Sequence, residues 1–149
     1  MLISTDDIAA FCEVLRKGGK KVVFTNGCFD ILHKGHVSYL NQARQLGDVL
    51  IIGLNSDASV KRLKGTSRPV NDQEARATVM AALKAVDYVV IFDEDTPYNL
   101  IREVKPDVLV KGGDYAIEQI VGREFARQTV TIPFVDGFST TQTIEKMKR

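Results

Sequence analysis

Residues 22–40 read VVFTNGCFDILHKGHVSYL, and the rest of the chain is organised around this stretch. Residues 21–25 are rich in β-branched and aromatic side chains and end at Asn26-Gly27, as in a buried parallel strand that opens into a loop. From residue 37 onward apolar residues recur at helical spacing, so a helix is predicted to begin near Gly35. The N–H groups and positive dipole end of a helix that begins after such a loop suit an anion such as phosphate.

The only two histidines of the chain, His33 and His36, stand three positions apart with Gly35 between them. Both imidazoles can converge on one anionic group, either as neutral hydrogen-bond donors or as cations if a phosphate raises their pKa. Two polar residues at an ordinary turn are the structural alternative. A zinc site that also uses Cys28 lacks a matching fourth ligand and has unsuitable spacing, so no resident metal is predicted.

Length and composition indicate one globular domain over residues 1–149, with residues 1–19 supplying a helix that packs on it. A net charge of +1 argues against a surface that coats nucleic acid. Cys12 and Cys28 make no disulfide framework and are expected to be reduced thiols. No stretch has the character of an export signal or a membrane span, so a cytoplasmic protein with no membrane or nucleic-acid partner is predicted.

The remaining chain repeats the alternation of apolar strands and amphipathic helices. Further strands are predicted at residues 48–54, 88–92, 108–110 and 130–135. This order predicts an α/β fold with a Rossmann-like, doubly wound, parallel five-stranded sheet. In such sheets ligands bind beyond the carboxyl ends of the strands, where the strand order reverses.

Four polar segments follow predicted strands, starting at Asn26, Asn55, Lys111 and Ser139, and can therefore share one cleft. Each also has a plainer interpretation. The basic stretch around Lys64, which is expected to be a loop, suits a solvated surface. The glycines after Lys111 suit a simple turn, and the segment from Ser139 suits a helix N-cap.

The motif HKGH after FTNGCFDILH is similar to the HxGH signature of the cytidylyltransferase-like nucleotidyltransferases. The resemblance implies that His33 and His36 hold the α- and β-phosphates of a nucleoside triphosphate during in-line transfer. It also implies that a lysine after the second strand and an arginine early on the next helix hold phosphates. Lys64 and Arg76 match those two positions, and Arg68 is a further candidate.

Within this family, the segments LNSDASVKRLKGTSRPVN, ALKAVDYVVIFDEDTP, LVKGGDY and DGFSTT resemble the adenylyltransferase part of ADP-heptose synthases. That resemblance implies ATP, with Mg²⁺ carried on it, and D-glycero-β-D-manno-heptose 1-phosphate as substrates. It implies a role in supplying heptose to the lipopolysaccharide core or to a related glycan. Because no kinase-length segment is present, a stand-alone enzyme is expected, and members of the family are commonly homo-oligomers.

The predicted site therefore falls into three groups. Predicted catalytic residues are His33, His36, Lys64 and Arg76. Predicted nucleotide-binding residues are Thr25, Asn26, Gly27, Phe29, Gly35, Lys111, Gly113, Asp114, Ser139, Thr140 and Thr141. Predicted substrate-binding residues are Asn55, Asp57 and Arg68, whereas Asp30 is expected to fix its loop.

Two other functions fit the same residues. A cytidylyltransferase acting on glycerol 3-phosphate would share the fold and motifs, and turnover of CTP rather than ATP would distinguish it. A non-catalytic nucleotide-binding module would bind nucleotide without releasing pyrophosphate. The sugar, its anomer and the base come only from the resemblance.

Overall fold

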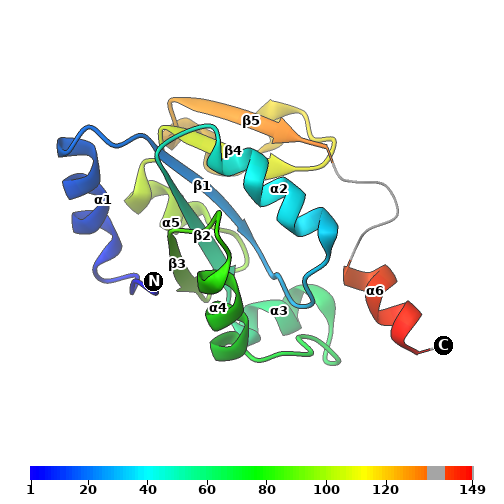
Figure 1. Cartoon of the computed structure of the whole chain (residues 1–149). Helices are drawn as coiled ribbons and strands as arrows, with labels where there is room; N and C mark the ends of the chain where they lie inside the picture. The colour runs from blue at the N-terminus through cyan, green and yellow to red at the C-terminus, as the bar shows by residue number, and fades with distance from the viewer. Residues whose placement is uncertain (134–139, 149) are drawn as a thin grey trace.

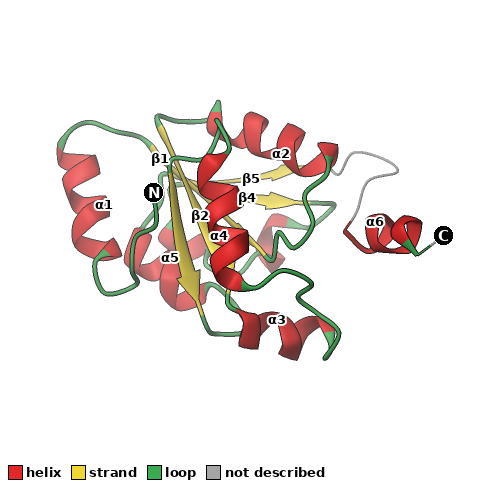
Figure 2. Cartoon of the chain, turned by 60° about the horizontal axis from the view of Figure 1, so that its bottom comes forward, coloured by secondary structure: helices red, strands yellow, loops and turns green. Residues whose placement is uncertain are grey.

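The computed structural model describes residues 1–133 and 140–148. Across these residues parallel strands alternate with helices, as Figures 1 and 2 show. The strands are β1 Val22–Gly27, β2 Val49–Asn55, β3 Tyr88–Phe92, β4 Val108–Gly112 and β5 Gln128–Ile132. The helices are α1 Ile8–Lys17, α2 Lys34–Arg44, α3 Asp57–Lys64, α4 Gln73–Ala82, α5 Tyr98–Val104 and α6 Thr140–Met147, with short 3₁₀ turns η1 Ile117–Gln119 and η2 Arg123–Phe125. None of the helices in these ranges is long and apolar enough to cross a membrane.

The described strands form one parallel sheet in the order β3-β2-β1-β4-β5. The chain moves outward from β1 to β3 and then returns to the other side of β1 for β4 and β5. The strand order therefore reverses between β1 and β4, which is the expected place for a ligand. The predicted doubly wound α/β fold is confirmed.

Both faces of the sheet are covered by helices, because side chains alternate between the two faces of each strand. On one face Leu40 of α2 and Met80 of α4 are fully buried in a core with the sheet. On the other face Ile8 of α1 and Ile101 of α5 are fully buried in a second core. Because helices cover both faces, the carboxyl ends of the strands are the part of the sheet that a ligand can reach.

Three local predictions were wrong. Residues 57–64 form helix α3 rather than a loop, because the Ser56 side chain caps the helix by accepting the Ser59 N–H at 3.2 Å. Lys64 is thus the last residue of a helix. The last strand begins at Gln128 and ends at Ile132, earlier than predicted; residues 134–135 lie outside the described residues. The connection from β4 to β5 contains two 3₁₀ turns instead of an α-helix.

Candidate active site

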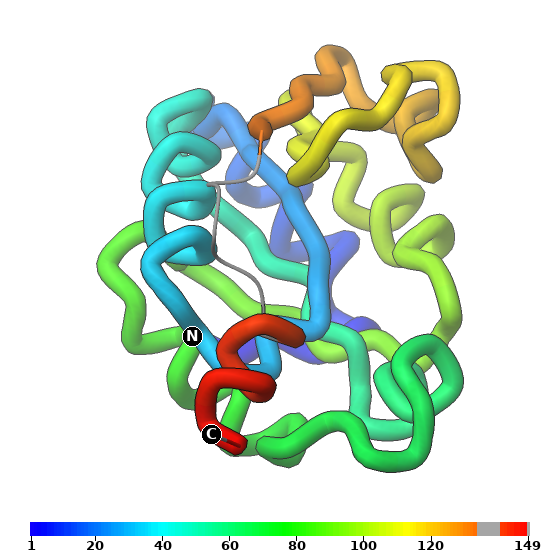
Figure 3. The backbone as a smooth tube through the Cα atoms, turned by 90° about the vertical axis from the view of Figure 1, so that its right-hand side faces the viewer, coloured from blue at the N-terminus to red at the C-terminus, as the bar shows by residue number. Residues whose placement is uncertain are grey.

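A cleft of about 770 Å³ lies at the carboxyl ends of β1, β2 and β4, where the strand order reverses. In Figure 1 the arrowheads of β1 and β5 point to the side on which α6 lies, and Figure 3 looks at that side. Thr141 and Gln142 of α6 line the same cleft as Asn26 and Gly27 of β1. Predicted site residues that line it are Asn26, Gly27, Phe29, His33, Gly35, His36, Asn55, Lys64, Arg68, Lys111 and Thr141.

His33 and His36 lie together at the N-terminus of α2. Their rings stack with centroids 3.9 Å apart and planes inclined by 23°. The backbone N–H of His33 donates to Nδ1 of His36 at 3.3 Å. Because Nδ1 accepts a hydrogen bond, a neutral His36 carries its proton on Nε2, which can donate to a ligand.

Both imidazoles are neutral near pH 7. Burial, together with the neighbouring His33, lowers the pKa of His36 from 6.5 to about 4. Burial also lowers the pKa of His33. The pair therefore meets an incoming anion with hydrogen-bond donors, and the positive charge of the cleft comes from other residues.

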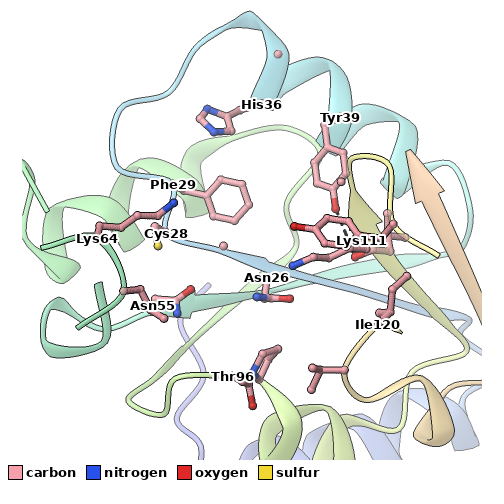
Figure 4. A pocket seen from close by; sticks show the side chains of 18 of the residues that line it. Asn26, Cys28, Phe29, His36, Tyr39, Asn55, Lys64, Thr96, Lys111 and Ile120 are labelled. Carbon is pink, nitrogen blue, oxygen red and sulfur yellow. Dashed lines mark hydrogen bonds between the residues drawn. The ribbon is translucent and has the colours of Figure 1, made fainter. Parts of the chain in front are cut away.

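Lys64 and Lys111 supply part of that charge from opposite walls. In Figure 4 the ammonium ends of both side chains point into the cleft, from its two sides. Burial lowers the pKa of Lys111, partly offset by Cys28, and the nearby charge of Lys64 lowers it further. Two lysines that face each other in this way favour an anion between them.

Asp30 joins the loop before α2 to the loop before α4. Its carboxylate accepts hydrogen bonds from Arg68 Nε at 2.9 Å, Val70 N at 2.8 Å and Asn71 N at 2.9 Å. Burial opposes ionisation of Asp30, but these partners outweigh burial and hold the pKa of the carboxyl below its usual range. Asp30 thus fixes the loop, as predicted, and ties down the guanidinium of Arg68.

Arg76, which is also predicted to hold a phosphate, lies behind the cleft lining. Its side chain is fully buried and it is not among the described residues that line the cleft. Its guanidinium donates to the carbonyl oxygens of Asn71, Cys28 and Asn55 at 2.8 to 2.9 Å. It also donates to Oδ1 of Asp57 at 2.9 Å. This geometry does not fit direct neutralisation of a reacting phosphate; Arg76 instead clamps the ends of β1 and β2 to the start of α4.

Several other predicted residues lie away from the cleft lining. Thr25 is buried and its hydroxyl is hydrogen-bonded to that of Tyr39. Asp57 is paired with Arg76, and the N–H of Gly113 donates to the carbonyl of Ile132 at 2.9 Å. Asp114 is exposed and does not line the cleft. Thr140 begins α6, and Ser139 lies outside the described residues.

Part of the cleft lining is not predicted from the sequence. Tyr39 stands three residues after His36, so helical spacing alone would have placed it on the same face. Asp95, Thr96 and Pro97 also line the cleft, from the loop that follows β3. Ile120 comes from the irregular connection between β4 and β5, which has no periodic pattern to indicate burial.

Comparison with known proteins places the chain in a family. Residues 24–146 match the cytidylyltransferase-like family model. The chain belongs to the cytidylyltransferase-like family. It is therefore a nucleotidyltransferase, as the HxGH motif predicted.

Curated relatives and solved structures agree with this placement. The chain is 60% identical over 143 residues to the bifunctional protein HldE of a Nitratiruptor species, covering 96% of this chain and 31% of the relative. It is 55% identical over 147 residues to HldE of Wolinella succinogenes, covering 99% of this chain and 31% of the relative. The chain thus spans about three tenths of the length of these relatives.

Two crystal structures have similar folds. One is the lipopolysaccharide core biosynthesis protein of Thermoplasma volcanium, with a TM-score of 0.68 and 31% identity, covering 79% of this chain and 100% of that one. The other is pantoate-β-alanine ligase of Francisella tularensis, with a TM-score of 0.66 and 16% identity, covering 100% of this chain and 79% of that one. The second likeness concerns the fold alone.

Proposed function

We propose that this chain transfers an adenylyl group from MgATP to D-glycero-β-D-manno-heptose 1-phosphate, giving ADP-heptose and pyrophosphate. The observation that carries the proposal is the pair of stacked histidines at the start of α2, in one cleft with Lys64 and Lys111. The choice of ATP and heptose rests on resemblance to ADP-heptose synthases. The 60% identity to HldE and the 31% identity to a lipopolysaccharide core biosynthesis protein support it.

The reaction is a direct in-line displacement. An oxygen of the sugar phosphate attacks the α-phosphorus of ATP, the bond from that phosphorus to the α,β-bridging oxygen breaks, and pyrophosphate leaves. The sugar phosphate is ionised at neutral pH, so no general base is needed. Catalysis then consists of positioning two anions and stabilising the charge that moves onto pyrophosphate.

Each cleft residue has a proposed part in this reaction. His33 and His36 donate hydrogen bonds to α- and β-phosphate oxygens, at the positive end of the α2 dipole. Lys64 and Lys111 offset the repulsion between the two substrates. Thr141, together with Ser139 and Thr140, has the proposed role of binding the departing pyrophosphate, and Asn55 that of binding a hydroxyl group of a substrate.

Magnesium enters as part of the MgATP substrate. Among the described lining residues Asp95 is the one carboxylate, and no three His, Cys, Asp or Glu side chains within residues 1–133 and 140–148 gather to hold a metal ion. This donor set fits an ion held mainly by phosphate oxygens. A cytoplasmic location, a homo-oligomeric state and the extent of the domain over residues 1–149 stay predictions.

The test is pyrophosphate release by the purified protein with Mg²⁺, crossing ATP and CTP with heptose 1-phosphate and glycerol 3-phosphate. Release with ATP and heptose 1-phosphate alone is the expected result. Release with CTP and glycerol 3-phosphate would keep the mechanism and replace both substrates. No release with any pair, together with nucleotide binding by calorimetry, would identify a non-catalytic binding module.

A further inference from the structure

One acidic side chain interrupts the positive lining of the cleft. Lys64, Arg68 and Lys111 line it as cations, and Asp95 is the one carboxylate among the lining residues that the structure describes. Asp95 lies in the loop that connects β3 to α5. A carboxylate repels phosphate groups, so a ligand's phosphates belong with the lysines and a neutral part of the ligand belongs beside Asp95.

Asp95 is paired with a basic side chain of α3. Nε of Arg62 contacts Oδ1 of Asp95 at 2.8 Å, and the same guanidinium donates to the carbonyl of Asp93. The two side chains are 48% and 64% exposed, and an ion pair this exposed contributes little to stability. The pair therefore orients the carboxylate of Asp95 more than it stabilises the fold.

The loop that carries Asp95 is attached to the end of β2. The amide of Asn55 donates to the hydroxyl of Ser59 at 3.0 Å, and that hydroxyl donates to the carbonyl of Glu94 at 2.9 Å. Asn55 and Ser59 are both buried. Asn55, Asp95 and Thr96 all line the cleft, and these three residues are called the polar wall below.

This polar wall lies away from the histidines. In Figure 4, Thr96 and His36 are on opposite sides of the cleft, with Asn26 between them. A carboxylate, a hydroxyl and an amide can together accept and donate several hydrogen bonds to neighbouring hydroxyl groups. The wall has the chemistry to bind a sugar ring, and the lysines have the chemistry to bind its phosphate.

We propose that Asn55, Asp95 and Thr96 form a subsite for the vicinal hydroxyl groups of a sugar, with Asp95 as the residue that determines specificity. The inference rests on the proposed nucleotidyl transfer. Two sugars can supply such hydroxyls, the ribose of the nucleotide and the ring of the acceptor sugar phosphate, and the experiment separates them.

The test compares Asp95→Asn with Glu94→Gln, which removes the charge of an exposed neighbour that does not line the cleft. Steady-state pyrophosphate release gives KM and kcat for ATP, 2′-deoxy-ATP and heptose 1-phosphate. Loss of a charged hydrogen-bond acceptor is expected to raise one KM about tenfold to a hundredfold. The kcat of Asp95→Asn and all constants of Glu94→Gln should stay within about threefold of the unaltered protein.

The KM values for the different substrates identify the sugar that the subsite binds. A raised KM for heptose 1-phosphate alone assigns the subsite to the acceptor. A raised KM for ATP, with equal use of ATP and 2′-deoxy-ATP by the variant, assigns it to ribose. Unchanged values of both KM, or an equal rise in Glu94→Gln, would overturn the proposal.

Failure of the proposed function is a separate outcome. If the unaltered protein releases no pyrophosphate with any substrate pair, calorimetric titration with ATP and with heptose 1-phosphate replaces the kinetic test. Binding at least about tenfold weaker in Asp95→Asn would still support the subsite. Equal binding by both proteins, or binding of neither compound by the unaltered protein, would overturn it.

Discussion

The family resemblance implies that Arg76 and Lys64 both hold phosphates, yet the two side chains differ in burial and in hydrogen bonding. Arg76 is 1% exposed and directs four hydrogen bonds at protein oxygen atoms, out of five N–H groups on a guanidinium. Lys64 is exposed at the end of α3 and its ammonium faces the cleft. A cation whose N–H groups already donate to protein oxygen atoms stabilises the segments around the site. A cation that is exposed to solvent is available to bind a ligand.

Among substitutions of these two cations, Arg76→Ala is expected to have the largest effect on stability. The substitution leaves three carbonyls and the Asp57 carboxylate without their donor, so the free energy of unfolding should fall by about 3–5 kcal/mol. Chemical denaturation measures it. Arg76→Lys keeps the charge but not the planar fork, so its loss should be intermediate. Unchanged stability with a large loss of turnover would instead mean that Arg76 acts on the phosphates.

Lys64→Ala should give the opposite pattern. Removing a charged donor to phosphate should lower kcat/KM about tenfold to a hundredfold. The free energy of unfolding should change by less than about 0.5 kcal/mol, because an exposed side chain is removed. Lys61→Ala is the matched control, since Lys61 is exposed on the same helix but does not line the cleft. If Lys61→Ala loses as much activity, the contribution of Lys64 is general electrostatics.

A further effect concerns pH and distinguishes the histidines from Asp30. The folded-state pKa of His36 is about 4, below its ordinary value of 6.5, so the unfolded chain binds more protons between these values. Stability should therefore be complete above about pH 6.5 and fall as the pH decreases toward 4. Asp30 has a lowered pKa, so its contribution is lost below about pH 4.

Denaturation of His36→Gln across this range measures the histidine contribution. The variant cannot titrate at this position, so its stability should decline less steeply than that of the unaltered protein between pH 6.5 and 4. Identical slopes for the two proteins would show that burial does not hold His36 neutral.

The parts of the site that could be predicted from sequence are those encoded by local pattern. The strand before Asn26, the helix after Gly35 and the two histidines at its start are all local, and the polar residues after β2 and β4 follow from the rule for parallel sheets. Loop fixing by Asp30 was also anticipated.

The rest depends on tertiary packing. The burial of Arg76 follows from oxygen atoms supplied by Cys28, Asn55 and Asp57, which no spacing in the sequence brings together. Ile120 reaches the cleft through 3₁₀ turns without periodicity. The basic stretch around Lys64 suits a surface loop, but the Ser56 side chain caps a helix that extends to Lys64.

The most direct test of the central claim is pyrophosphate release from MgATP and heptose 1-phosphate by His36→Ala beside His36→Gln. If Nε2 of His36 donates to a phosphate in the transition state, His36→Ala should lose about a hundredfold to a thousandfold in kcat, with its circular dichroism spectrum unchanged. His36→Gln, which can place an amide N–H near the position of Nε2, should recover part of that loss. Near-normal turnover by a folded His36→Ala protein would contradict the assignment of this cleft as the nucleotidyl-transfer site.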